Sequence, residues 1–117
     1  MYSEGLLEHF RNPRNVGELP PPAIIVEVAN PVCGDILRLS VRFEGLVVAE
    51  ARYKTRGCTA SIATGSALTE WLAGKTKQDL SELKPSTVEA LVGELSAESK
   101  HAALLCSDAV KLLLNHD

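Results

Sequence analysis

The most regular alternation of apolar and polar positions lies between residues 37 and 54. In its first half every second residue is apolar, namely Leu37, Leu39, Val41 and Phe43. The alternation continues over residues 47–54, and a period of two is typical of strands that bury one face. Because Glu44-Gly45 separates the two runs, and glycine tolerates the positive φ of tight turns, the pattern predicts a β-hairpin.

The segment Ile24–Val28 is apolar and β-branched, which predicts a first strand beside the hairpin. Together the three runs predict a three-stranded antiparallel sheet with one face that needs cover. Helical patterns take up most of the remaining chain and supply that cover. The order of helix, three strands and then helices is typical of an α+β fold, which we expect to be a single domain spanning residues 1–117.

Capping residues and breakers predict where the helices begin and end. Ser3 caps a first helix over residues 2–10, and Gly74 ends a helix over 58–73 that is rich in small side chains. Thr76-Lys77-Gln78-Asp79 and Ser86-Thr87-Val88-Glu89 each match a capping box that opens a short helix. Ser96 is expected to cap a last helix that runs to about Leu114.

Pairing within the hairpin brings two cysteines together. If Phe43 lies opposite Leu46, Cys33 falls opposite Arg56 and Asp35 opposite Lys54. Cys58 follows two residues after Arg56. Cysteines that lie 25 residues apart in the sequence are therefore expected to be neighbours at one end of the hairpin.

Composition and charge exclude several functional classes. The 117 residues are 45% hydrophobic with a formal charge of −3, so nothing indicates nucleic-acid binding. No apolar run approaches the roughly 20 residues of a membrane span, and the first residues lack the pattern of a signal peptide. We expect a cytoplasmic protein, in which three free thiols are stable and an odd cysteine count argues against a disulfide framework.

Three thiols and one carboxylate are candidate ligands: Cys33, Asp35, Cys58 and Cys106. Four such groups can hold tetrahedral zinc or an iron–sulfur cluster, although the spacings of 25 and 48 residues match neither zinc ribbons nor ferredoxins. The alternative is that the cysteines are small core residues, which for Cys106, on the inner face of a helix, is the favoured interpretation. From the residues alone we predict a soft-metal or sulfur-handling site.

The three histidines are interpreted as non-ligands. His9 lies at a helix end and His116 near the last residue. His101 precedes Cys106 by five positions, which is about 140° around a helix, so the two cannot readily share one ion. Hydroxyl side chains such as Ser61 have no neighbouring acid–base partner in the sequence that would indicate a nucleophile.

Five motifs in order resemble the iron–sulfur cluster assembly scaffolds called IscU, SufU and the N-terminal domain of NifU. They are His9–Gly17, Asn30–Asp35, Lys54–Cys58, Thr69–Lys75 and Cys106-Ser107. The resemblance implies that Cys33, Asp35, Cys58 and Cys106 hold a transient [2Fe–2S] cluster, or Zn²⁺ in the cluster-free form. It also implies persulfide sulfur from a PLP-dependent cysteine desulfurase with Cys106 as acceptor, an iron donor, and transfer to apo iron–sulfur proteins.

Two departures from the family pattern leave its subtype open. Many members carry Pro-Pro-Val-Lys-x-His-Cys before the third cysteine, whereas the matching stretch here is Lys100–Cys106, with Leu105 at the histidine position. The missing Pro–Lys motif argues against recognition by the dedicated Hsp70-type chaperone. The segment after Gly74 also lacks the insertion typical of SufU. Two functions therefore stay open: a non-enzymatic scaffold, and a zinc-bound sulfur acceptor that activates a cysteine desulfurase.

Overall fold

The computed structural model describes residues 2–31, 34–93, 95–96 and 99–115. One helix precedes three strands, and four helices follow them, which confirms the predicted α+β class. The elements are α1 (Glu4–Arg11), β1 (Ile24–Ala29), β2 (Ile36–Glu44), β3 (Val47–Arg56), α2 (Thr59–Leu72), α3 (Lys77–Ser81), α4 (Pro85–Val92) and α5 (Lys100–Leu114).

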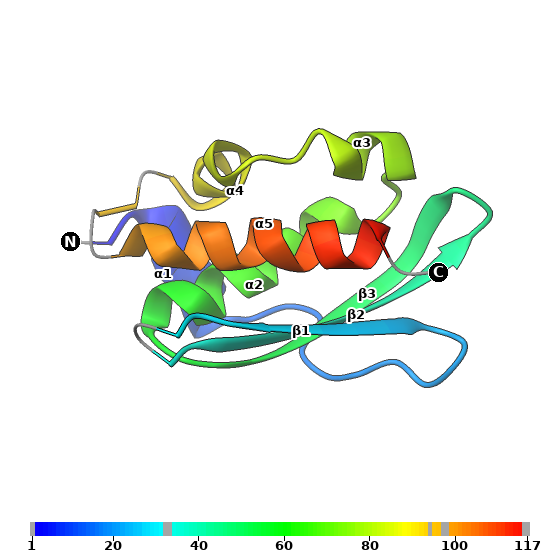
Figure 1. Ribbon diagram of the computed structural model, residues 1–117. Helices are drawn as coiled ribbons and strands as arrows, with labels where there is room; N and C mark the ends of the chain where they lie inside the picture. The colour runs from blue at the N-terminus through cyan, green and yellow to red at the C-terminus, as the bar shows by residue number, and fades with distance from the viewer. Residues whose placement is uncertain (1, 32–33, 94, 97–98, 116–117) are drawn as a thin grey trace.

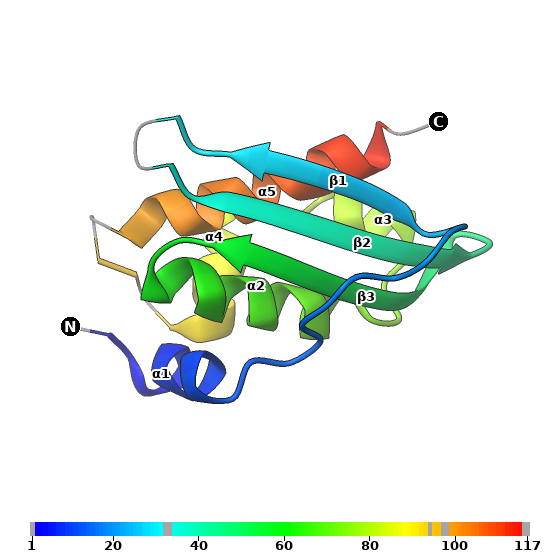
Figure 2. The same ribbon diagram turned by 90° about the horizontal axis from the view of Figure 1, so that it is seen from below.

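The three strands form one antiparallel sheet in the order β1-β2-β3, as the sequence predicted. Helices α2 and α5 cover one face of this sheet, while α1 lies beside α2 (Figures 1 and 2). Alternate residues of β2 line the core on the sheet side, where Leu37, Leu39 and Val41 are almost fully buried. The linker after α1 pairs with the free edge of β3, where Gly17 N–H donates to the Tyr53 carbonyl.

The register of the hairpin differs from the predicted one. Arg38 rather than Asp35 lies opposite Lys54, and Ile36 lies opposite Arg56. The turn falls one residue later than expected, since β2 runs to Glu44 and β3 begins at Val47. A bulge between Arg42 and Phe43 shifts the pairing again. The two displacements move Asp35 past the end of β3, where it meets the start of α2.

Helix starts agree with the capping patterns in two places and differ in two. Ser3 caps α1, and Thr76 forms the predicted capping box with Asp79. Helix α4 begins at Pro85 rather than at Ser86, because the fixed φ of proline suits the first helical position. Helix α5 begins after Ser99, and Ser96 lies outside it with its hydroxyl bonded to that of Ser99.

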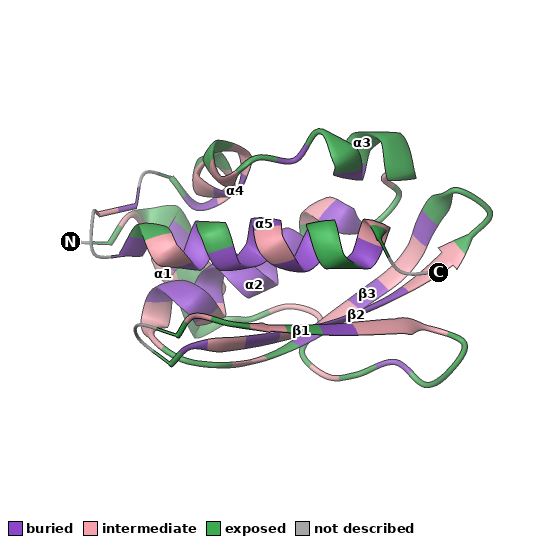
Figure 3. Ribbon diagram, in the orientation of Figure 1, coloured by how far each residue is buried: buried purple, intermediate pink, exposed green. Residues whose placement is uncertain are grey.

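Small side chains let α2 lie close to the sheet. Much of α2 is buried (Figure 3), and its buried residues include Ala60, Ala63 and Ala67. A Cβ atom at Gly65 would lie 2.5 Å from Cε2 of Tyr53, so only glycine fits there. The Tyr53 hydroxyl donates to the carbonyl of Ile62 at 2.8 Å, which ties β3 to α2. This close packing fixes where the first residues of α2 meet the end of the hairpin.

Among the helices that the structure describes, none has both the length and the apolar character to cross a membrane.

Candidate metal centre

Three side chains from different parts of the chain converge at one end of the molecule. Asp35 precedes β2, Cys58 is the N-cap of α2, and His101 lies in the first turn of α5. Their potential ligand atoms all lie within 4.8 Å of one another. His101 Nε2 is 3.2 Å from Asp35 Oδ2 and 3.7 Å from Cys58 Sγ. Nitrogen, oxygen and sulfur donors are thus gathered around one point.

Hydrogen bonds hold the carboxylate of Asp35 in place. The Ser61 hydroxyl donates to Oδ2 at 2.6 Å, and the Nε2–H of His101 can donate to the same oxygen. Burial alone would raise the pKa of Asp35, but the hydrogen bonds from Ser61, His101 and Cys58 outweigh it and lower the pKa below its usual value. Asp35 is therefore an ionised carboxylate at neutral pH, the form that binds a cation.

Gly57 makes room for this carboxylate. A Cβ atom at position 57 would lie 2.5 Å from Asp35 Cγ and 2.8 Å from both carboxylate oxygens. No side chain larger than that of glycine fits without displacing Asp35. The glycine before Cys58 is thus explained by the close approach of the carboxylate.

Cys58 is placed by the start of α2. It is a free, half-buried thiol whose Sγ lies 3.5 Å from Ser61 Oγ, one helical turn later. At the N-terminus of a helix the backbone amides and the helix dipole favour negative charge. A thiolate there can bind a metal ion or attack an electrophilic sulfur.

His101 lies in the cluster although we interpreted it as a non-ligand. Its side chain is 25% exposed, compared with 9% for Asp35, so it lies between the cluster and solvent. A cavity of about 110 Å³ adjoins it, lined by residues from the end of β1, the β1–β2 loop and α5: Ala29, Asn30, Pro31, Leu104, Leu105 and Asp108. The spacing along α5 excluded a site shared by His101 and Cys106. The neighbours of His101 in the structure are instead Asp35, at the end of the hairpin, and Cys58, at the start of α2.

The structure does not bring Cys106 to this cluster. Cys106 is 2% exposed within the core, on the face of α5 that also carries Ala102 and Val110. Burial raises the pKa of its thiol to about 12, against a smaller opposing effect of a hydrogen bond with Thr64. Burial, with a smaller contribution from Cys106, also raises the pKa of Tyr53 to about 12. The Cys106 thiol is thus a buried, neutral group in this structure.

Three of the residues singled out by the sequence remain: Cys33, His9 and His116. Cys33 and His116 lie outside the described residues. His9 belongs to a separate network, in which its Nδ1 lies 2.8 Å from Ser66 Oγ and its Nε2 lies 3.5 Å from Glu70. His9 therefore links α1 and α2.

The donor set suits a borderline or soft cation. Thiolate, imidazole and carboxylate are the ligands that zinc takes in proteins, and thiolate and imidazole also bind iron in clusters. Among the residues that the structure describes, the cluster offers three ligands, and a tetrahedral ion takes four, so another thiolate or an exogenous sulfur can complete the set.

The sequence of this chain also matches a known protein family. A family model described as the NifU-like N-terminal domain matches residues 1–115. The chain belongs to this family. An iron–sulfur cluster assembly scaffold protein, IscU 1 of Archaeoglobus fulgidus, is 34% identical over 111 residues, which are 95% of this chain and 72% of the relative. The scaffold protein IscU of Haemophilus influenzae is 35% identical over 114 residues, covering 94% and 90%.

Most of these relatives are named as scaffolds, but not all. The Drosophila melanogaster relative, 35% identical over 118 residues that cover 97% of this chain and 76% of its own, is called an iron–sulfur cluster assembly enzyme IscU. The names agree on assembly of an iron–sulfur cluster and differ on the words scaffold and enzyme.

Solved structures share the fold. A protein assigned as an iron–sulfur cluster assembly scaffold of the SUF system from Fervidobacterium islandicum AW-1 superposes with a TM-score of 0.80 at 20% identity, covering 97% of this chain and 96% of that one. The N-terminal part of a NifU-like protein from Brucella abortus gives 0.67 at 18% identity, covering 97% and 81%. At these identities the likeness shows the fold alone.

Proposed function

We propose that this protein is a scaffold on which an iron–sulfur cluster is assembled before it passes to other proteins. The observation that carries the proposal is the convergence of Asp35, Cys58 and His101 in a chain about 35% identical to named cluster-assembly scaffolds. Such a protein provides the site at which iron and sulfur are brought together, and it then passes the finished cluster on. We propose a cytoplasmic location, where reduced thiols persist.

We propose that Cys33, Asp35, Cys58 and His101 form the ligand set of a transient [2Fe–2S] cluster or of Zn²⁺. Cys33 precedes Asp35 by two residues, which supports its inclusion. Cys106, which the resemblance implied as a ligand, is left out because its thiol is buried and neutral. The carboxylate and the imidazole bind iron of a cluster less well than thiolates do, which favours a cluster that is easily handed on.

Sulfur is proposed to arrive as persulfide from a PLP-dependent cysteine desulfurase. The resemblance implied Cys106 as the acceptor, but an acceptor has to reach the donor, and the half-buried Cys58 is better placed than the core thiol. The partners we propose are the desulfurase, an iron donor and apo iron–sulfur proteins. The sequence provides no Pro–Lys motif for a dedicated Hsp70-type chaperone.

The alternative function is that of a zinc-bound sulfur acceptor that activates a cysteine desulfurase. The donor set favours it specifically, since sulfur, nitrogen and oxygen ligands together are common in zinc sites. In that case zinc would hold the thiol that receives the persulfide sulfur. The protein would then retain one tightly bound zinc and would form no chromophore.

Anaerobic reconstitution with ferrous iron, cysteine, a desulfurase and a thiol reductant, which reduces the persulfide sulfur to sulfide, separates the two functions. Visible absorption of a [2Fe–2S] centre, followed by transfer to an apo-ferredoxin, would establish the scaffold. Absence of a chromophore, with one zinc retained and faster desulfurase turnover, would establish the acceptor. Cys58→Ser is expected to abolish either outcome, and the matched Cys106→Ser variant is expected to keep it. If Cys106→Ser abolished the activity and Cys58→Ser kept it, Cys106 would be a residue of the site.

A further inference from the structure

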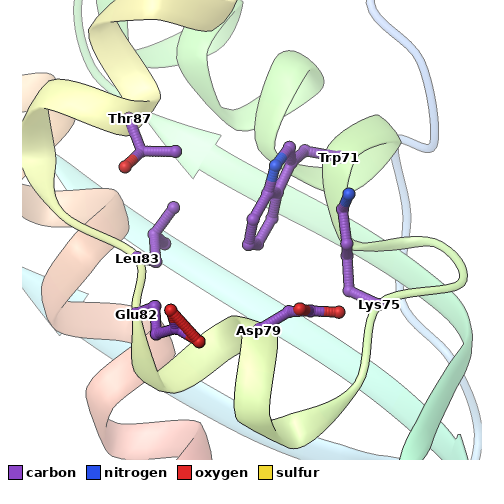
Figure 4. A pocket seen from close by; sticks show the side chains of 6 residues that line it. All are labelled: Trp71, Lys75, Asp79, Glu82, Leu83 and Thr87. Carbon is purple, nitrogen blue, oxygen red and sulfur yellow. The ribbon is translucent and has the colours of Figure 1, made fainter.

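A second cavity lies among the helices, away from the candidate metal centre. Its volume is about 240 Å³, and it is lined by Trp71, Lys75, Asp79, Glu82, Leu83 and Thr87 (Figure 4). Trp71 lies in the last turn of α2, 13 residues after Cys58, which corresponds to about 20 Å along the helix axis. A partner bound in this cavity would therefore leave the metal centre open to a different one.

The cavity has one aromatic wall. The ammonium group of Lys75 lies 5.2 Å from the ring centroid of Trp71, so one side of the indole already carries a cation. The other side faces into the cavity, toward Leu83 and Thr87 (Figure 4). A flat ligand group can stack on this open side of the ring.

The cavity carries more negative than positive charge. Lys75 is its one cationic lining residue, whereas Asp79 and Glu82 place two carboxylates along its margin (Figure 4). Hydrogen bonds from Thr76 keep the pKa of Asp79 below its usual value, so this carboxylate is ionised at neutral pH. Within the described part of the chain, neither carboxylate forms an ion pair. One added cation would balance the charge of the cavity.

We propose that this cavity binds an arginine side chain presented by a partner protein. A planar guanidinium can stack on the open face of Trp71 while its N–H groups reach Asp79 and Glu82. The ammonium of lysine is compact and strongly hydrated, so it would match the aromatic wall less well. The proposal rests on this cavity alone and is independent of the function of the metal centre.

Each contact that the cavity offers is weak, so we expect the arginine to be bound as part of a protein rather than as a free cation. At an exposed site one stacking or ionic contact changes affinity by roughly fivefold or less. Two or three such contacts cannot retain a small molecule at cellular concentrations. An arginine within a larger interface has the remaining affinity supplied by its neighbours, and this cavity then selects where the partner docks.

Trp71 allows a direct test because it is the single tryptophan of the sequence. The test follows its indole N–H signal by NMR during titration with a blocked Gly-Arg-Gly peptide at low salt. We expect a saturable shift, a roughly fivefold or greater loss of affinity for the matched citrulline peptide, and weakening by added salt. The expected affinity is low, so the titration extends to the solubility limit of the peptide.

Two charge-neutralising variants complete the test. Glu82→Gln is expected to weaken binding of the arginine peptide roughly fivefold. Glu44→Gln, at the end of β2 and outside the cavity, is expected to leave it unchanged. Circular dichroism checks that both variants are folded. Equal binding of the citrulline peptide, no effect of Glu82→Gln, or no saturable shift would each overturn the proposal. Tighter binding of free arginine than of the peptide would overturn the assignment to a protein partner.

Discussion

Cys58 and Cys106 occupy two regions of the same fold, and each has a serine close by in the sequence. At the end of the hairpin, Cys58 is half-buried and Ser61 donates to Asp35. In the core of α5, Cys106 is 2% exposed, and the neighbouring Ser107 hydroxyl has no hydrogen-bond partner within the described residues. The two environments differ so much that the same residue type is expected to act as a ligand at position 58 and as a packing group at position 106.

The difference between the regions follows from how α5 is placed. The helix meets the metal centre only with its first turn, where His101 reaches Asp35 and Cys58. Cys106, five residues later, faces the apolar interior instead. Burial there favours the neutral thiol. Removal of the Cys58 thiol should therefore weaken metal binding, whereas removal of the Cys106 thiol should lower the stability of the fold.

The largest expected effect is on metal affinity. Cys58→Ser should weaken Zn²⁺ binding by about 100-fold or more, because a thiolate ligand is lost. Cys106→Ala should change it less than about threefold while lowering the free energy of unfolding by about 1 kcal/mol, since a small cavity is left. Anaerobic competition with a chromophoric chelator measures the affinity, and urea unfolding measures the stability. A large loss of zinc in Cys106→Ala would contradict the comparison.

The next effect concerns the hydroxyl that positions Asp35. Ser61→Ala should weaken Zn²⁺ binding about 10- to 100-fold, because hydrogen bonds to ligands orient them. Ser61→Thr keeps the hydroxyl and should recover most of the affinity. The same chelator competition applies. If alanine and threonine behave alike, Ser61 is a packing residue and the carboxylate is held by other contacts.

Much of this fold could be predicted from the sequence because local patterns determine it. The alternation around Leu39 predicted β2, and Thr76 with Asp79 predicted the start of α3. The bulge after Arg42 could not be predicted, since no glycine or other signal marks that point. The predicted register conflicted with the alternation, because it placed apolar Leu39 opposite Glu50, whereas the observed register places it opposite Tyr53.

The candidate site was predicted in part. The resemblance implied Asp35 and Cys58 in one ligand set, and their potential ligand atoms lie within 4.8 Å of each other. The hairpin predicted Cys33 beside Cys58, and Cys33 lies outside the described residues. His101 was missed because its position depends on where α5 docks, which no local pattern specifies. The start of α5 was predicted at Ser96 rather than after Ser99, so the placement of its first turn was also wrong. A histidine in the first turn of a helix is only a weak sequence signal for a metal site. His101 becomes a candidate ligand because α5 packs so that this side chain contacts Asp35 and Cys58.

A smaller effect is expected at alkaline pH. The pKa of Cys106 is about 12 in the folded protein and 9.0 ordinarily. Above about pH 9 the unfolded chain therefore loses this proton while the folded chain retains it, and stability falls by about 1.4 kcal/mol per pH unit. Urea unfolding between about pH 8 and pH 10 should show a steeper decline for the parent protein than for Cys106→Ala. Parallel declines would mean that the thiol is not buried in the folded state.

The smallest expected effect is at Ser107. Its buried hydroxyl has no partner among the described residues, so the folded protein bears the cost of removing that group from water. Ser107→Ala should leave the stability unchanged or raise it by about 1 kcal/mol, which thermal unfolding would register as an increase of a few degrees. Zinc affinity should stay the same. A destabilised variant would show that the hydroxyl has a partner, and a variant with weaker zinc binding would connect this part of α5 to the metal centre. Either result would contradict the contrast between Ser61, which donates to Asp35, and Ser107, which has no partner among the described residues.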